Sequence, residues 1–405
     1  MKKVMCLCAL LIGGAGALSA QKKGFDYKFY GQVRTDFYYN SRANSETVDG
    51  LFYMYPQDTR LDAAGQDLNA VANSNFYTLY SRVGVDVAGP QLGNIQTSAK
   101  VEVDFRGSGT SYSMFRMRHV YFNLAWNHSS LLVGQTWHPL YGDVAPQILN
   151  LNMGAPFQPF SRAPQIRFRY KAGDIQLTGA AIWQSQYLSQ GPDGKSQKYI
   201  KESCIPEIYI GADYKRSNWL VGAGIEMISL KPRTQSVVED EVYKVDERVT
   251  ALSYEVHMKY TSPLWYVAAK SILGSNLTQV SMLGGYGVKS TDARTGEQEY
   301  SPNRNSSSWL NIAYGKKWKP AVFLGYMKNL GTSDEISKMY GTGTNVDQLV
   351  STSAELTYNV PHWKLGVEYN LTSAWYGSMK SSNGKIIDTH SVSNNRLVAT
   401  VLFMF

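Results

Sequence analysis

The sequence predicts an all-β protein, a transmembrane antiparallel β-barrel of about sixteen strands. Three observations support this prediction. Segments of alternating polar and apolar residues recur along the chain, the connections between them alternate between short and long, and the final strand ends on Phe405. Neighbouring residues of a strand face opposite sides of a barrel wall, so a wall between lipid and water requires such alternation.

Residues 1–20 predict a secretory signal peptide, which leaves a single barrel domain over residues 21–405. Lys2 and Lys3 precede an apolar stretch that ends at Leu18, and small residues follow it. We expect cleavage after Ala20. One cysteine, Cys204, then remains in the mature chain, which excludes an internal disulfide.

The composition favours a barrel over a soluble exported protein. The chain has 28 Tyr, 9 Trp and 35 Gly, and only 18% of its residues are charged. Beyond the signal peptide, no apolar run is long enough for a membrane helix. The net charge of +8 is modest. It argues against nucleic acid as a partner and is compatible with small anions.

Period-two alternation defines the predicted strands. In residues 95–106, for example, Val101 and Val103 alternate with Glu102 and Asp104. A charged face needs water while the apolar face needs lipid, which suits a barrel wall. The predicted strands are 28–40, 75–88, 95–106, 114–126, 130–137, 164–171, 175–187, 204–214, 219–230, 248–260, 265–274, 307–316, 321–330, 347–359, 363–375 and 391–405.

Tryptophans gather at the short connections. Trp126, Trp219, Trp265, Trp318 and Trp363 lie in or beside them, as in the aromatic girdle of a membrane interface. Short periplasmic turns and long outer loops would place both termini in the periplasm. The alternative is that these tryptophans, like the terminal strand, belong to the core of a soluble β protein.

The third long connection, residues 138–163, is a candidate for folding into the barrel. It contains four prolines and several large apolar residues, among them Leu140 and Leu149. That composition is too apolar for a solvated loop, and sixteen strands enclose a water-filled channel that such a segment can narrow. Packing against other outer loops or within a subunit interface is the alternative.

A file of basic residues follows this loop. Arg167, Arg169 and Lys171 share one face of their strand, and apolar residues share the other. Lipid exposure costs roughly 2–4 kcal/mol for each such charge at the midplane, so we expect the file to face the lumen. A ring of basic side chains selects for anions.

Acidic residues that are also predicted to face the lumen weaken the prediction of anion selectivity. Asp36, Asp86 and Glu102 share the predicted lumen phase with basic residues, and the charges can simply pair across strands. Arg116 and Arg118 occupy positions of their strand that the alternation predicts to face lipid. Either they lie above the membrane or a bulge changes the phase.

Three stretches resemble the DcaP-like porins: FRMRHVY at 115–121, LVGQTW at 132–137 and RAPQIR at 162–167. The resemblance covers the central third of the chain. It implies a trimeric sixteen-stranded channel in the outer membrane of a Gram-negative-type bacterium, with a preference for small anions such as dicarboxylates. It also implies a constriction near Gln135, Trp137 and Arg162. Some relatives carry an N-terminal coiled coil; we expect none in the mature chain, so trimerisation would rest on the barrel wall.

The leading hypothesis is an outer-membrane porin for passive diffusion of small hydrophilic solutes, favouring anions such as carboxylates. The alternatives are a surface adhesin and a membrane-embedded barrel enzyme. The predicted constriction and selectivity residues are Arg34, Arg82, Lys100, Gln135, Trp137, Asp143, Arg162, Arg167, Arg169 and Lys171.

Partners and cofactors follow from the same hypothesis. We expect small solutes, outer-membrane lipid, two further copies of the chain and the barrel-assembly machinery, which would recognise Phe405. We expect no catalytic residue, no cofactor and no metal. The acidic run Glu239-Asp240-Glu241 is a candidate for calcium, although a solvated loop explains it better.

Overall fold

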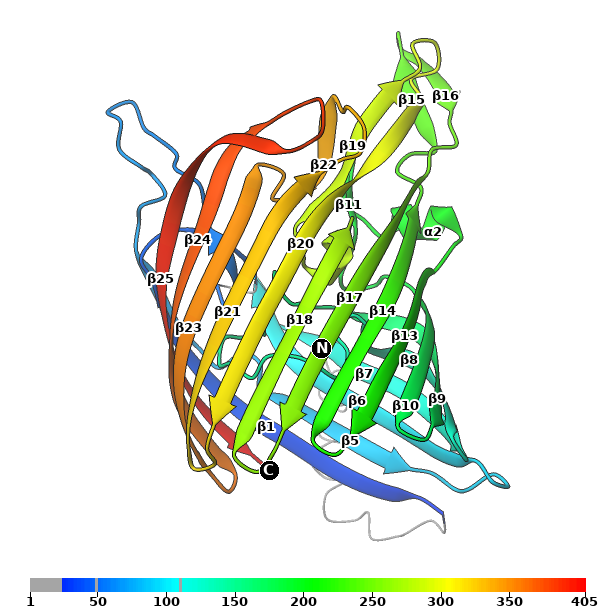
Figure 1. Ribbon diagram of the computed structural model, residues 1–405, viewed down its shortest axis with the longest axis vertical. Coiled ribbons are helices and arrows are strands. Elements are labelled where there is room, and N and C mark those ends of the chain that lie inside the picture. Colours follow the sequence, from blue (N-terminus) through cyan, green and yellow to red (C-terminus); the bar gives the residue numbers. More distant parts are fainter. Residues whose placement is uncertain (1–23, 48–49, 109–110) are drawn as a thin grey trace, which may run out of the picture.

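The computed structural model describes residues 24–47, 50–108 and 111–405, so the predicted signal peptide lies outside the described residues. Within them, sixteen strands form a closed antiparallel barrel (Figure 1). The strands are β1 (Asp26–Asn40), β4 (Asn73–Tyr77) continued by β5 (Arg82–Ala88), β6 (Gln96–Ser108), β7 (Ser111–Trp126), β8 (Ser129–Trp137), β9 (Arg162–Ala172), β10 (Ile175–Ile182), β13 (Glu207–Arg216), β14 (Trp219–Leu230), β17 (Val249–Thr261), β18 (Trp265–Ser275), β20 (Gln298–Tyr314), β21 (Trp318–Gly331), β23 (Val346–Val360), β24 (Trp363–Met379) and β25 (Ile386–Met404).

The first and last strands close the barrel. β1 pairs with β25 from Gln32–Met404 to Asn40–Arg396. The backbones of Gly31 and Phe405 then exchange two hydrogen bonds of 2.9 and 3.1 Å. Closure leaves no free sheet edge, which is what lipid requires of a spanning sheet. Among the helices of the described residues, none is long and apolar enough to cross a membrane.

Alternation along β17 shows how the sequence sets the two faces of the wall. Leu252, Tyr254 and Val256 point outward and are about half exposed, whereas Ser253 and Glu255 between them are buried. Apolar side chains thus meet lipid and polar ones meet the barrel interior, because successive side chains of a strand alternate between faces. This confirms the basis on which the strands were predicted.

Two predicted strands have wrong boundaries because their residues turn into the barrel. The predicted strand 75–88 is interrupted at residues 78–81, where Tyr80 adopts a φ of +69° and is buried. The predicted strand 175–187 ends at Ile182. Just beyond it, Gln184 donates a hydrogen bond of 2.8 Å to Glu207. Tertiary contacts therefore override the local alternation.

The sheet continues above the barrel rim on one side. The strand predicted at 307–316 begins at Gln298, because β20 extends upward and pairs with β19 (Gly284–Thr291), which pairs with β22 (Lys338–Thr342) (Figure 1). The other elements of the long loops are β2 (Asn44–Thr47), β3 (Phe52–Pro56), β11 (Gln190–Gly191), β12 (Gly194–Lys195), α2 (Lys198–Ser203), β15 (Gln235–Val238), β16 (Glu241–Lys244) and the 3-10 helix η2 (Thr278–Val280).

A β-bulge decides which way the two arginines of β7 face. Glu102 of β6 pairs with His119 of β7, whereas the next residue, Val103, pairs with Met117. The extra residue, Arg118, shifts the alternation, as bulges do. Met117 therefore points outward and is 55% exposed, while Arg118 is 4% exposed. The sequence left open whether Arg116 and Arg118 lie above the membrane or beyond a bulge, and the structure shows the bulge. Arg116, two residues before Arg118, also faces the barrel interior, where it pairs with Asp104.

Aromatic pairs mark the end of the barrel that carries the short turns. Four tryptophans at these turns are partly exposed on the outer face, and each packs against an aromatic ring of the neighbouring strand. Such a belt fits a membrane interface, and short turns belong to the periplasmic side of outer-membrane barrels. The pairs, with their centroid distances, are Trp219–Tyr260 (4.9 Å), Trp265–Tyr314 (4.7 Å), Trp318–Tyr358 (4.8 Å) and Trp363–Phe403 (4.8 Å).

Candidate functional site

The segment between β8 and β9, residues 138–161 and called loop 3 below, contacts the inner face of the wall. Its side chains Leu140, Val144 and Phe157 are almost fully buried. Ser307 of β20 donates a hydrogen bond of 3.0 Å to the backbone oxygen of Phe157, and Trp309 donates one of 2.8 Å to Gln158. These contacts place loop 3 inside the barrel.

Charged side chains of the wall satisfy the backbone of loop 3. Lys270 of β18 donates to the carbonyl oxygens of Leu140 and Tyr141. On the other side, Glu355 of β23 accepts a hydrogen bond of 2.6 Å from the backbone N–H of Leu149, and Glu368 of β24 accepts one of 2.8 Å from the following N–H. Buried backbone groups need such partners, so these contacts fix the path of the loop.

Shortening loop 3 is expected to enlarge the channel. Gln158 donates to the backbone oxygen of Val144 (3.3 Å), so the two ends of residues 145–157 are close enough for a short Gly-Ser linker to join them. The linker removes Phe157 and uncovers the wall residues against which the loop packs, such as Phe323. We expect single-channel conductance to rise at least about twofold, since a sixteen-stranded barrel encloses an aqueous lumen.

The matched control shortens a loop outside the barrel. Replacing residues 237–242 at the tip of the β15–β16 hairpin removes exposed residues far from the wall (Figure 1). This variant should keep the conductance of the unmodified protein. Equal conductance in both loop variants and the unmodified protein would contradict a restricting role for loop 3.

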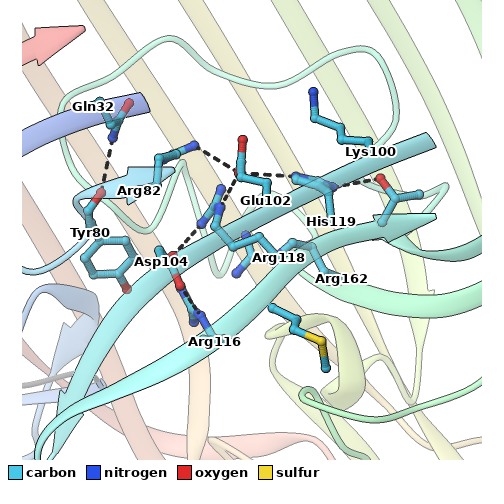
Figure 2. Close-up of polar contacts among 12 residues, drawn as sticks. Gln32, Tyr80, Arg82, Lys100, Glu102, Asp104, Arg116, Arg118, His119 and Arg162 are labelled. Carbon is cyan, nitrogen blue, oxygen red and sulfur yellow. Dashed lines mark hydrogen bonds and ion pairs between the residues drawn. The ribbon is translucent and has the colours of Figure 1, made fainter. Parts of the chain in front are cut away.

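Five charged residues of β5, β6 and β7 form a connected group, called the Arg118 network below (Figure 2). Arg118 bridges Glu102 (2.6 Å) and Asp104 (2.9 Å), Arg82 approaches Glu102 (3.6 Å), and Arg116 reaches Asp104 (2.6 Å). Both carboxylates are almost fully buried. Charge-assisted hydrogen bonds of this kind need both partners, because an unpaired buried charge is strongly unfavourable.

Arg162 lies beside this network without a carboxylate of its own (Figure 2). Its guanidinium lies over the ring of Trp137 at 4.6 Å and donates a hydrogen bond of 2.9 Å to Tyr187. Nε and Nη1 have no hydrogen-bond partner among the described residues. Together with the three arginines of the network, Arg162 leaves four positive charges against two carboxylates. The interior here carries a positive excess that cation–π contacts partly stabilise.

A second basic group surrounds Asp143 of loop 3. Arg169 of β9 (3.6 Å) and Lys215 of β13 (3.1 Å) approach its carboxylate. Lys259 of β17 donates a hydrogen bond of 2.6 Å to its backbone oxygen. These four residues, called the Asp143 cluster below, combine three positive charges with one negative charge. Asp143, Arg169 and Lys215 are each about a third exposed, so their excess charge faces water.

Three further lysines face the lumen near the short turns. Lys171 of β9, Lys319 of β21 and Lys364 of β24 share the inward phase of their strands. Lys319 donates to the side chain of Gln147 in loop 3. Lysines of several strands therefore line the lumen near the short turns, together with Lys215 and Lys259 of the Asp143 cluster.

No family model matches the chain. No curated protein matches its sequence either. Solved structures do. The outer membrane channel DcaP of Acinetobacter baumannii superposes with a TM-score of 0.67 at 19% identity, over 95% of this chain and 99% of that one. The fold is that of an outer-membrane porin.

Other porin-fold structures agree with this assignment. OmpT, an outer membrane protein of Vibrio cholerae, gives a TM-score of 0.57 at 12% identity, over 95% of this chain and 99% of its own. OmpF of Salmonella typhi gives 0.51 at 12% identity, over 94% and 98%. At the level of the fold, the likeness to DcaP-like porins is confirmed.

Within this porin fold, several predicted residues form ion pairs inside the barrel. Arg34 pairs with Asp36 (2.8 Å) and also donates to the backbone of loop 3, while Lys100 pairs with Asp86 (2.8 Å). Arg82 belongs to the Arg118 network. Ion pairing, the alternative to free positive charge, thus accounts for all three residues, along β1 for Arg34 and across strands for Lys100 and Arg82.

Two predicted constriction residues do not line an open passage. Gln135 shares the outward register of Val120 and donates a hydrogen bond of 2.8 Å to the backbone oxygen of Met117 on that face. Its inclusion was wrong, because alternation on β8 turns it outward. Arg167 does face inward, but it is buried and its guanidinium bonds Gln165 and the backbone of Trp137.

Sequence reasoning missed Lys215 and Lys259 as lumen residues. Lys215 lay in a predicted turn, one residue beyond the strand end assumed at 214, and β13 in fact extends to Arg216. Lys259 lies at the end of a correctly predicted strand, on the inward phase with Glu255. Both lysines would have been predicted if every second residue had been assigned to the lumen up to the end of each strand.

Proposed function

We propose that the protein is an outer-membrane porin for passive diffusion of small hydrophilic solutes, with a preference for anions such as carboxylates. The porin fold supports the channel. The observation that carries the anion preference is the Asp143 cluster, where three positive charges surround one carboxylate at a partly exposed place beside loop 3. A ring of basic side chains lowers the electrostatic barrier for anions.

The two basic groups have different roles in this proposal. Arg118 and both carboxylates of the Arg118 network are buried and paired with one another, so the network holds the wall and the neighbouring aromatic residues in place. The Asp143 cluster is partly exposed, so a passing anion can approach its cations without tight binding. Because water screens each contact, no single residue dominates selectivity, and the excess charge of the whole cluster sets it.

Liposome swelling tests the channel itself. Vesicles that contain the protein should swell in small neutral solutes and in small carboxylates, and faster in the carboxylates. Vesicles with protein inactivated by shortening β25 provide the background. Equal, background-level swelling in all solutes would overturn the porin proposal.

The remaining parts of the proposal concern export and assembly. Residues 1–20 would direct export, and the barrel would assemble as a homotrimer in outer-membrane lipid. A trimer form is described for OmpT of Vibrio cholerae, which shares this fold. The mass of the detergent complex, measured by light scattering, tests the oligomeric state.

Phe405 is proposed as the residue that the barrel-assembly machinery recognises. Its ring is 58% exposed on the outer face, while its backbone already pairs with Gly31. We expect Phe405→Ser to lower the amount of folded protein in the outer membrane severalfold, with little effect on refolding in detergent. Met404→Ser, next to it, is the control. Equal loss in both variants, or loss in detergent as well, would contradict recognition of Phe405.

A further inference from the structure

Two buried carboxylates lie side by side on the inner wall. Glu207 of β13 is 1% exposed and Glu226 of β14 is 0% exposed. Glu226 pairs in register with Tyr209, which lies two residues from Glu207 on the same face. The two glutamates are therefore diagonal neighbours across adjacent strands, within reach of each other.

Glu207 joins three loops to the wall. It accepts hydrogen bonds from Gln184 (2.8 Å), which follows β10, and from Gln279 of η2 (3.1 Å). The Nε2 atom of His138, at the start of loop 3, lies 3.2 Å from the same carboxylate. One side chain thus meets segments of three separate connections above the lumen.

Glu226 has no such partners. Apart from the hydroxyl of Ser253, no side chain of the described residues offers Glu226 a hydrogen bond, and the Oε1 atom of Gln279 has no hydrogen-bond partner among them. The Gln279 amide is adjacent, since its nitrogen bonds Glu207. Glu226 pairs in register with Ser253.

A further amide lies next to Ser253. The hydroxyl of Ser253 accepts a hydrogen bond from the backbone N–H of Ser275 (3.1 Å), and Asn276 follows directly. Asn276 is 1% exposed, and neither atom of its amide has a hydrogen-bond partner among the described residues. Two buried amide oxygens without partners, those of Gln279 and Asn276, thus belong to segments that contact Glu207 and Ser253.

A bound cation compensates buried negative charge of this kind. A buried carboxylate next to another is strongly unfavourable unless a positive charge or a proton compensates it. We propose that Glu207 and Glu226, with the amide oxygens of Gln279 and Asn276, bind one calcium ion. The four side chains supply only oxygen ligands, and Ca²⁺ accepts irregular sets of about six to eight oxygens, water included. Zn²⁺ prefers nitrogen and sulfur ligands.

The proposed site differs from clusters made only of ionisable ligands. No group of three or more His, Cys, Asp or Glu residues in the described part of the chain could hold a metal ion. Two carboxylates and two amides form the site instead. The ion would fasten loop 3 and the segments at Gln184 and Gln279 to β13 and β14, so calcium stabilises the loops that cover the lumen.

The test measures calcium bound to protein refolded in detergent free of lipopolysaccharide. After treatment with EDTA, addition of CaCl₂ and desalting, we expect about one Ca²⁺ per chain. Calcium should also raise the thermal unfolding midpoint. Glu226→Gln should bind no calcium, and its midpoint should not respond. The control is Glu241→Gln, in the exposed acidic run that the sequence offered as a calcium candidate.

Each outcome decides for or against the site. Binding that survives in Glu226→Gln, or that disappears in Glu241→Gln, overturns the proposal. So does the absence of calcium from the unmodified protein, which would mean that Glu226 holds a proton. If Glu226→Gln fails to fold, Gln279→Ala is the second variant, with calcium affinity expected to fall about tenfold. Unchanged affinity in that variant also counts against the site.

Discussion

Reversing two charges in the Asp143 cluster is expected to remove the anion preference. In Lys215→Glu with Lys259→Glu, three positive charges and one negative become one positive and three negative. Both lysines lie on inward phases near the short turns, where the side chains are partly exposed. The barrel should fold, because neither lysine is part of a fully buried ion pair.

The expected magnitude follows from Coulomb's law. One unit of charge about 8 Å from an ion in water contributes roughly 0.5 kcal/mol. Four units change, and screening at moderate salt reduces their sum to about 1 kcal/mol. Chloride is disfavoured and potassium favoured by this amount, so the two barriers differ by a further ~2 kcal/mol. The permeability ratio of chloride to potassium should therefore fall about thirtyfold, as a shift of the reversal potential measures.

The control changes the same number of charges outside the barrel. Lys201 of α2 and Lys244 of β16 are exposed in the long loops. Lys201→Glu with Lys244→Glu should leave the reversal potential almost unchanged. If the two double variants shift it equally, selectivity comes from the overall charge of the protein and not from the Asp143 cluster.

Removing Arg118 is expected to destabilise the barrel more than any other single change in the Arg118 network. In Arg118→Ala, Glu102 and Asp104 both lose their strongest shared partner while they stay buried. Breaking a buried ion pair in this way typically costs about 3–5 kcal/mol. Urea unfolding from lipid vesicles measures the free energy of unfolding.

The matched control is Lys100→Ala, on the same face of β6. Its partner Asp86 is 46% exposed, so the pair is mostly solvated. Its loss should cost at most about 1 kcal/mol. An equal, small effect of both variants would show that water reaches the Arg118 network, and the distinction between a buried and an exposed basic group would fail.

The barrel could be predicted because lipid and water impose a strict alternation. The strand predicted at 219–230 has the bounds of β14, and the short turns and their tryptophans lie where the pattern placed them. Extensions above the rim, such as β19 and β22, escaped prediction. Above the rim, both faces of the sheet meet protein or water, so the sequence there need not alternate between polar and apolar residues.

The interior was harder to predict because it depends on tertiary contacts. The facing of Arg118 rests on a bulge that alternation alone leaves open. Asp143 was named from sequence, but its three cations come from strands far apart in the chain. Glu226 gave no signal at all, since a glutamate on an inward phase looks like any other lumen residue until its surroundings are known.

The reversal potential of the unmodified protein tests the central claim most directly. Single channels are measured in a planar bilayer that separates two different KCl concentrations. A reversal potential with the sign of the chloride equilibrium potential is the predicted result, since the partly exposed Asp143 cluster has an excess of positive charge. A reversal potential with the sign of the potassium equilibrium potential, or a reversal potential of zero, would contradict an anion-selective porin.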